Sequence, residues 1–264
     1  MSTHTSAAIL LLTLAAPLPA QNVHDVAAYF GTAFSTPGAA ATIAEQPILG
    51  DNIDTWGIAP FYTHESLGDF GAVTPSGDVS VNVLGGSLFA SLFSGRLGLV
   101  ATGAYINPSC PDGFDCKGFA TAGGAALFRL LRAPIGSDSG ANVTLSLRAS
   151  GGWAFAPDSD RYASASVGVP IALSAAEGSY RVVAFVTPGL TWATLKTLVP
   201  NASLDSLVLF HHDGVRGMLS GGVAFVPSRS GVGVHLGFQR IFVDHAGSQF
   251  SVALSWNLPK LGDR

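Results

Sequence analysis

The sequence predicts an all-β fold, a closed antiparallel up-and-down β-barrel of about ten strands, within a range of about 8 to 12. Three observations predict it. Long segments alternate apolar and polar residues at period two, short and long connections follow one another, and the chain is apolar without a long apolar run. Strands of ordinary globular domains have about 5 to 6 residues, so segments of about twice that length in one register indicate a different setting.

The clearest alternation lies in NVTLSLRASGGWAF, residues 142–155, where apolar residues form one series and Asn, Thr, Ser and Arg the other. Residues 162–175, 232–242 and 250–258 alternate in the same way. Six further segments, more diluted by Gly and Ala, complete the predicted strands: 54–63, 79–93, 96–106, 118–131, 180–192 and 215–226. An apparent phase change at Gly85 and Gly86 predicts a β-bulge there.

The connections predict the topology. Those at 94–96, 175–179 and 227–231 are short, and 133–141 is somewhat longer. The other connections are long and include 64–78, 107–117 and 197–213. Tight turns therefore gather at one end of a meander and long loops at the other, with both ends of the chain on the tight-turn side.

Composition excludes several classes of protein. Hydrophobic residues make up 48% of the chain and charged residues only 11%, against about 25% in average soluble proteins. No internal apolar run reaches the roughly 18 residues of a membrane helix, which excludes helical insertion of the mature chain. The net charge of −4 and the absence of a basic run argue against nucleic-acid binding.

Four regions are expected along the chain. Residues 1–20 form a secretory signal, with an apolar stretch followed by Pro17 and Pro19 and cleavage before Gln21; a buried N-terminal helix is the alternative. Residues 21–52 are an extra strand, a plug or a periplasmic segment, residues 53–258 form the barrel, and residues 259–264 are a tail. Cys110 and Cys116 flank the turn sequence PDGFD, so export to an oxidising compartment predicts a disulfide rather than a metal site.

The apolar faces are predicted to contact lipid. Strands of about 10 to 14 residues can cross a bilayer at a tilt of about 45°, and only a closed sheet leaves no backbone group unpaired in hydrocarbon. Aromatic residues lie near the predicted strand ends, as expected at the headgroup level: Trp56, Tyr62, Tyr105, Trp153, Phe155, Trp192, Phe242 and Trp256.

Over residues 53–258 the chain resembles the small outer-membrane β-barrel proteins of Gram-negative bacteria, in its signal, its alternating strands, its turn asymmetry and its final strand SVALSW. The resemblance implies a monomer in the bacterial outer membrane, assembled by the barrel-assembly machinery and in contact with outer-membrane lipid and lipopolysaccharide. Members usually end at an aromatic residue, whereas here Trp256 is followed by NLPKLGDR.

Acidic residues gather in or beside the predicted long loops, Glu65 among them, and histidines lie near them, with His64 next to Glu65. Aspartates in loops are common turn formers, and the alternative is a divalent-cation site at this rim. Its candidate ligands are Asp158, Asp160, His211, His212, Asp213, Asp244 and His245. No other cofactor is indicated.

The predicted lumen is lined mostly by Gly, Ala, Ser and Thr, with four larger polar residues as candidates for a constriction: Arg148, His235, Gln239 and Arg216. The predicted function is passage or binding of a small solute, or envelope structure, without enzymatic activity. One alternative is a hydrolase using the rim histidines, although no nucleophile motif accompanies them. The other is a secreted soluble β-sandwich used in adhesion, in which Leu145, Leu147, Val167, Val169 and Leu254 would face a common interior.

Overall fold

A computed structural model describes residues 55–69, 78–109, 118–136, 140–155, 161–201, 206–227, 231–242 and 248–258. The predicted signal, the N-terminal segment, the loop of Cys110 and Cys116 and the C-terminal tail lie outside these residues. Within them, no helix is long and apolar enough to cross a membrane.

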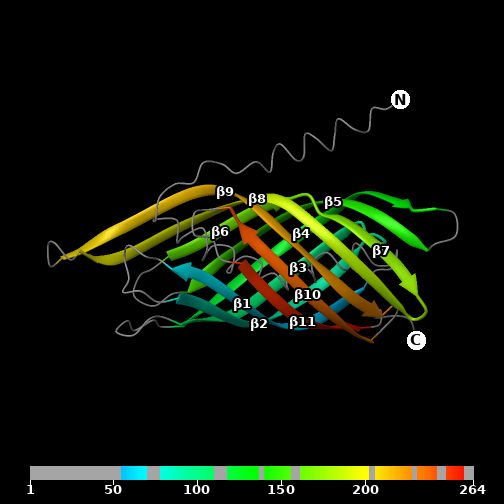
Figure 1. The fold of residues 1–264 in the computed structure, drawn as a ribbon, viewed down its shortest axis with the longest axis horizontal. Coiled ribbons are helices and arrows are strands. Elements are labelled where there is room, and N and C mark those ends of the chain that lie inside the picture. The colour runs from blue at the N-terminus through cyan, green and yellow to red at the C-terminus, as the bar shows by residue number, and fades with distance from the viewer. Residues whose placement is uncertain are drawn as a thin grey trace, which may run out of the picture.

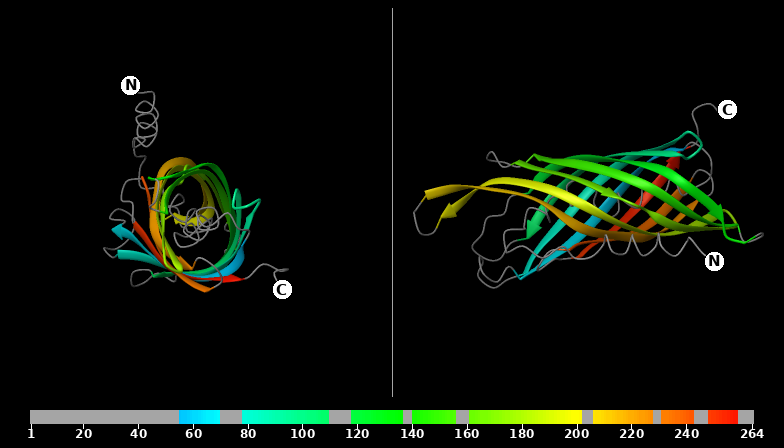
Figure 2. Two further views of the ribbon diagram at one scale, coloured as in Figure 1. Left: turned by 90° about the vertical axis from the view of Figure 1, so that its right-hand side faces the viewer. Right: turned by 90° about the horizontal axis from the view of Figure 1, so that it is seen from above.

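The described residues form one closed antiparallel sheet, seen end-on as a ring in Figure 2 and from the side in Figure 1. β1 and β11 close it, from Trp56 opposite Leu258 to Ser66 opposite Ser248. The strands are β1 (Trp56–Asp69), β2 (Asp78–Leu92), β3 (Leu97–Ser109), β4 (Phe119–Pro134), β5 (Ala141–Phe155), β6 (Arg161–Gly168), β7 (Ile171–Glu177), β8 (Tyr180–Asn201), β9 (Ser206–Pro227), β10 (Gly231–Ile241) and β11 (Ser248–Leu258).

β6 and β7 occupy one position in the barrel, so the described sheet is a ten-stranded barrel, as predicted. Both strands pair with β5 and β8 in an unchanged register. The break lies at Pro170, which has no N–H group to donate to the ladder. The ladder continues around it, because the N–H of Val169 donates to the carbonyl of Pro188 and the N–H of Ser146 to that of Pro170, both at 3.0 Å.

The predicted long loop at 197–213 is largely strand. β8 and β9 each have 22 residues and remain paired as far as Asn201 opposite Ser206. Figure 1 shows this hairpin extending well beyond the other strands at one end of the barrel. The sequence SLVLF at 206–210 is rich in residues that favour strands, and its pairing with the end of β8 outweighs the turn tendency of Pro200 and Asn201.

The predicted bulge at Gly85 and Gly86 is absent, because β2 keeps one register with both neighbours through these residues. The apparent phase change arises because the inward series of β2 is itself apolar, with Val83 and Phe89 buried. The register instead shifts between Ser66 and Asp69, and again between Arg129 and Leu131.

The outward face is apolar over the height of a hydrocarbon layer. Leu97 and Tyr105 of β3 both face outward, eight residues apart, which is about 27 Å along the strand and about 21 Å of height at a tilt of about 40°. Exposed aromatic residues mark the two boundaries of this apolar band: Tyr62, Tyr105, Trp153, Phe155 and Phe250 toward the long loops, and Trp56, Phe93, Tyr180 and Trp256 toward the short turns. The polar residues His64, Asn107 and Arg240 face outward beyond the first set.

The β-sandwich alternative is wrong. Leu147, Val167 and Leu254 are 47%, 56% and 50% exposed and point away from the barrel interior, and the sheet has closed on itself instead of forming two stacked layers. In water this amount of exposed aliphatic surface would be an aggregation hazard, so the medium around the strands is expected to be lipid.

Candidate functional site in the barrel interior

The barrel interior combines two kinds of wall. On β1–β4 the large buried side chains are apolar, and Glu65 is the only large polar one among the described residues. On β5–β11 the buried face is rich in serine and threonine and holds the remaining large polar side chains: Arg148, Arg181, Arg216, His235, Gln239, Gln249 and Asn257. The four predicted lumen residues therefore all lie buried on this second wall.

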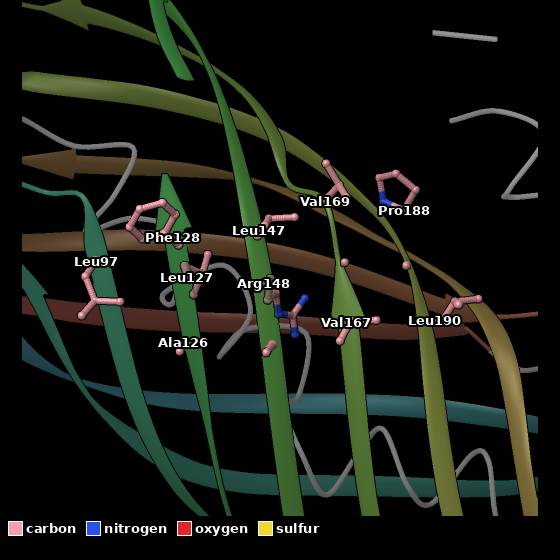
Figure 3. A pocket seen from close by; sticks show the side chains of 13 residues that line it. Leu97, Ala126, Leu127, Phe128, Leu147, Arg148, Val167, Val169, Pro188 and Leu190 are labelled. Atoms are coloured by element: carbon pink, nitrogen blue, oxygen red, sulfur yellow. The ribbon is translucent and has the colours of Figure 1, made fainter. Parts of the chain in front are cut away.

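Arg148 crosses the interior from β5. Its Nη1 donates to the hydroxyl of Ser220 on β9 at 3.5 Å, although β6 and β8 lie between these two strands. Figure 3 shows Arg148 between Leu127 on β4 and Val167 on β6. The guanidinium group thus connects two parts of the wall that are not neighbours in the sheet.

On the next two strands of the sheet, β6 and β8, the residues in line with Arg148 are glycines. Gly168 lies opposite Arg148, and Gly189 lies opposite Gly168. A Cβ atom at Gly189 would come within 2.5 Å of the carbonyl oxygen of Val167, so the strands approach too closely there for a side chain. Neighbouring side chains fill the space that larger residues would need there: Cγ2 of Thr187 lies 2.8 Å from the Cβ position of Gly168, and Cε of Met218 lies 3.3 Å from that of Gly189.

A row of polar residues continues from Ser220 around the barrel. Ser220 lies opposite Gln239, Gln239 opposite Gln249, and Gln249 opposite Glu65. Nε2 of Gln249 donates to Oε2 of Glu65 at 3.4 Å across the closing seam. We call Arg148, Ser220, Gln239, Gln249 and Glu65 the polar row; it begins at a guanidinium group and ends at a carboxyl group.

Glu65 was predicted in a long loop beside His64, and this was wrong. It is 3% exposed on the inward face of β1. His64 faces outward, and its Nδ1 lies 3.0 Å from Oδ1 of Asn82. Adjacent residues of a strand point to opposite faces, so these two cannot form a pair. Extending the inward series of Ala59 and Phe61 by two further steps would have placed Glu65 inside.

His235 and Arg216 lie apart from the polar row. The ring of His235 is fully buried, and its Nε2 lies 2.7 Å from Oγ of Ser255. On the neighbouring strands, the residues opposite His235 are Ala224 and Ala253. Arg216 turns back on its own strand, with Nη1 donating to the carbonyl of Val215 at 2.8 Å. Of the four predicted lumen residues, only Arg148 and Gln239 are thus brought into one arrangement.

The barrel interior is closed to water at more than one level. Thr63, Val83 and Ile106, at the level of the aromatic boundary toward the long loops, and His235, further along the barrel, all face inward and are 0% exposed. Side chains that line a water-filled pore remain exposed, so these values indicate a filled interior rather than a wide channel. The predicted lining of Gly, Ala, Ser and Thr with four larger polar residues also omits large apolar side chains, because Phe61, Phe89, Phe119, Phe185, Leu127 and Met218 all face inward.

The side chains of the predicted rim site lie outside the described part of the structure. Asp158, Asp160, Asp244 and His245 lie outside the described residues, and of His211, His212 and Asp213 only the backbone, in β9, is described. Among the residues that the structure does describe, no three His, Cys, Asp or Glu side chains come together as a metal site. The cation site and the hydrolase alternative remain predictions.

A hollow of about 540 Å³ lies at the break between β6 and β7 and is apolar in its lining. Figure 3 shows the side chains around it, which come from β3, β4, β5, β8 and the β6–β7 segment. Phe128, Leu147, Val167 and Leu190 belong to the outward series and are exposed. The inward residues Leu127 and Arg148 also line it, so the hollow opens on the lipid-facing surface at the position of Arg148.

No protein-family model matches the chain, and no curated protein matches it in sequence. Among solved structures, the N-terminal β-barrel domain of Pseudomonas aeruginosa OprF matches with a TM-score of 0.35 at 8% identity, covering 79% of this chain and 99% of that one. The outer membrane protease OmpT of Escherichia coli matches with a TM-score of 0.36 at 9% identity, covering 77% and 93%. The chain is similar to these outer-membrane barrels in architecture alone.

Proposed function

We propose that the protein is an integral β-barrel of the bacterial outer membrane that binds or admits a small polar solute along the polar row. The membrane location is supported by the exposed apolar band and its aromatic boundaries, because lipid is the medium in which such a surface is stable. Short turns of such barrels face the periplasm, so the long loops would face outward, toward lipopolysaccharide.

The barrel is proposed to act as a monomer. Within the apolar band the closed sheet offers no free strand edge to a second copy, and the free edges of the β8–β9 hairpin lie beyond it. The barrel would reach the membrane through the barrel-assembly machinery. The proposed role includes no enzymatic step.

The observation that carries the solute role is the polar row. It sets a guanidinium group, a hydroxyl, two amides and a carboxyl group in succession across a buried interior, where each polar group needs a hydrogen-bonding partner. Oε1 of Gln239 has no hydrogen-bond partner in the described structure. A polar solute entering the barrel would meet acceptors and donors along one line.

Conductance of the full chain in a planar bilayer tests this role. We expect small, intermittent currents, because the interior is filled, and a shift of ion selectivity toward cations in Arg148→Gln, because the variant removes a cation from the path. Arg240→Gln is the matched control, since it removes the same charge from an outward side chain near the long-loop end of β10. Equal selectivity in the two variants would contradict a path along the polar row.

A second candidate, a purely structural barrel of the envelope, is supported by the 0% exposure of the inward side chains Thr63, Val83, Ile106 and His235. It predicts no currents from wild type or from either variant, and no uptake of small solutes by vesicles that contain the protein. The same bilayer recordings therefore decide between the two roles.

A further inference from the structure

Three arginines surround a second hollow, at the short-turn end of the barrel. Its volume is about 640 Å³, and Arg96, Arg129, Arg132 and Asn142 contribute its polar lining. None of these residues belongs to the polar row. The guanidinium groups make this hollow a concentration of positive charge in a chain that has only 13 Lys and Arg residues.

The β4 bulge places two of these arginines on one face. Arg129 lies opposite Ser146, but after the register shift Arg132 lies opposite Thr144. Ser146 and Thr144 are both buried on the inward face, so Arg129 and Arg132 share that face. In a regular strand, residues three positions apart would point to opposite faces, so the bulge is what brings the two guanidinium groups together.

Arg129 also holds the β2–β3 turn that carries the third arginine, Arg96. Its backbone N–H donates to the carbonyl of Arg96 at 2.9 Å, and its Nη2 donates to the carbonyl of Ser94 at 3.0 Å. Phe93 and Ser94 have φ angles of 55° and 56°, a conformation that non-glycine residues adopt rarely. The β2–β3 turn is therefore held against β4 in a strained shape that keeps Arg96 at the hollow.

Charge favours an anion at this place. Arg129 lies in the positive fields of both Arg132 and Arg96, so gathering the three groups is unfavourable in itself. An anion shared between them offsets this repulsion. Guanidinium groups bind phosphate with paired hydrogen bonds, which makes phosphate a better match than a monovalent halide.

We infer that Arg96, Arg129 and Arg132 bind a phosphate group at the short-turn mouth of the barrel. The inward face of Arg129 and Arg132 suits a soluble phosphate compound. Leu130 and Leu131 line the same hollow and are 50% and 54% exposed, which suits a phospholipid headgroup whose acyl chains contact them. The inference goes beyond the proposed solute role and does not depend on conduction.

Binding of inorganic phosphate to the full chain in a zwitterionic detergent tests the soluble source by titration calorimetry. We expect saturable binding to wild type and an affinity at least about tenfold lower in the double variant Arg96→Gln, Arg132→Gln. Arg129 is left in place because it holds the turn. Arg240→Gln is the control and should bind as wild type does, and heat-modifiable gel mobility checks that each variant has folded.

The lipid source is tested with the same proteins in vesicles of phosphatidylcholine, with and without a minor fraction of phosphatidylglycerol. If the ligand is a headgroup, phosphatidylglycerol raises the urea midpoint of wild type and of Arg240→Gln but not of the double variant. Calorimetric binding without this effect identifies a soluble ligand. The inference is overturned if neither form of phosphate binds, or if the folded double variant responds as wild type does, and neither result depends on measured currents.

Discussion

A single arginine placed at two depths of β2 tests the assignment of lipid to the outward face. Leu88 and Leu84 are both leucines of the outward series, with exposures of 60% and 67%. Leu84 lies in the row of the aromatic boundary, opposite Tyr62 and Tyr105, whereas Leu88 lies midway between Leu84 and Leu92. The two positions therefore differ in depth and in little else.

The structure sets the size of the expected effect. Four residues separate Leu88 from each end of the band, which is about 14 Å along the strand and about 10 Å of height at a tilt of about 40°. An arginine near the middle of a bilayer costs about 2–4 kcal/mol in such barrels, and one at the boundary about 0–1 kcal/mol. We expect Leu88→Arg to lose the larger amount of unfolding free energy and Leu84→Arg the smaller.

Urea titration of the protein refolded into phospholipid vesicles measures both values, with the denaturant slope confirming that the same surface unfolds. If the outward face met water instead, both substitutions would change the free energy of unfolding by less than about 0.5 kcal/mol, as surface changes usually do. Equal free energies for the two variants would refute the assignment of lipid to this face.

Two further predictions use the same measurement. Gly189→Ala should cost about 1–3 kcal/mol, because its Cβ would lie 2.5 Å from a backbone oxygen of the next strand, whereas Gly86→Ala, whose Cβ meets nothing closer than 3.9 Å, should be near neutral. Ser255→Ala should lower the free energy of unfolding by about 1–3 kcal/mol, because it leaves Nε2 of the buried His235 ring without its partner. Ser164→Ala should lower it by less, because the buried hydroxyl that it removes has no hydrogen-bond partner. Equal losses within either pair would contradict the contacts described.

The number and position of the strands could be predicted because lipid constrains every outward residue in the same way. In β5 the outward series holds Leu147 and Trp153 while the inward series holds Thr144 and Arg148, so the two faces differ clearly. In β2 both faces are apolar, and the contrast that reveals register disappears. The bulge predicted at Gly85 follows from that loss of contrast.

The lengths of the connections and the contacts between inward side chains could be predicted less well than the strands, for different physical reasons. The β8–β9 hairpin extends beyond the other strands, where pairing between two strands alone determines where they end. Arg132 faces inward only because of the β4 bulge, which no period-two pattern reveals. The polar row depends on the closing seam, where Gln249 meets Glu65 from the other end of the barrel, 184 residues away in sequence.

This difference between the two faces also indicates which residues are expected to determine the function. Outside the barrel, the membrane requires an apolar residue at each position and accepts many of them, so the outward series carries little information about role. Inside, the fold requires only that polar groups find partners, and serine or threonine would satisfy that requirement with smaller side chains. A long cationic side chain such as Arg148, reaching across the interior to Ser220 past glycine on two strands, exceeds what closure of the sheet needs. Such inward residues are therefore the ones whose replacement is expected to alter the behaviour of the barrel more than its stability.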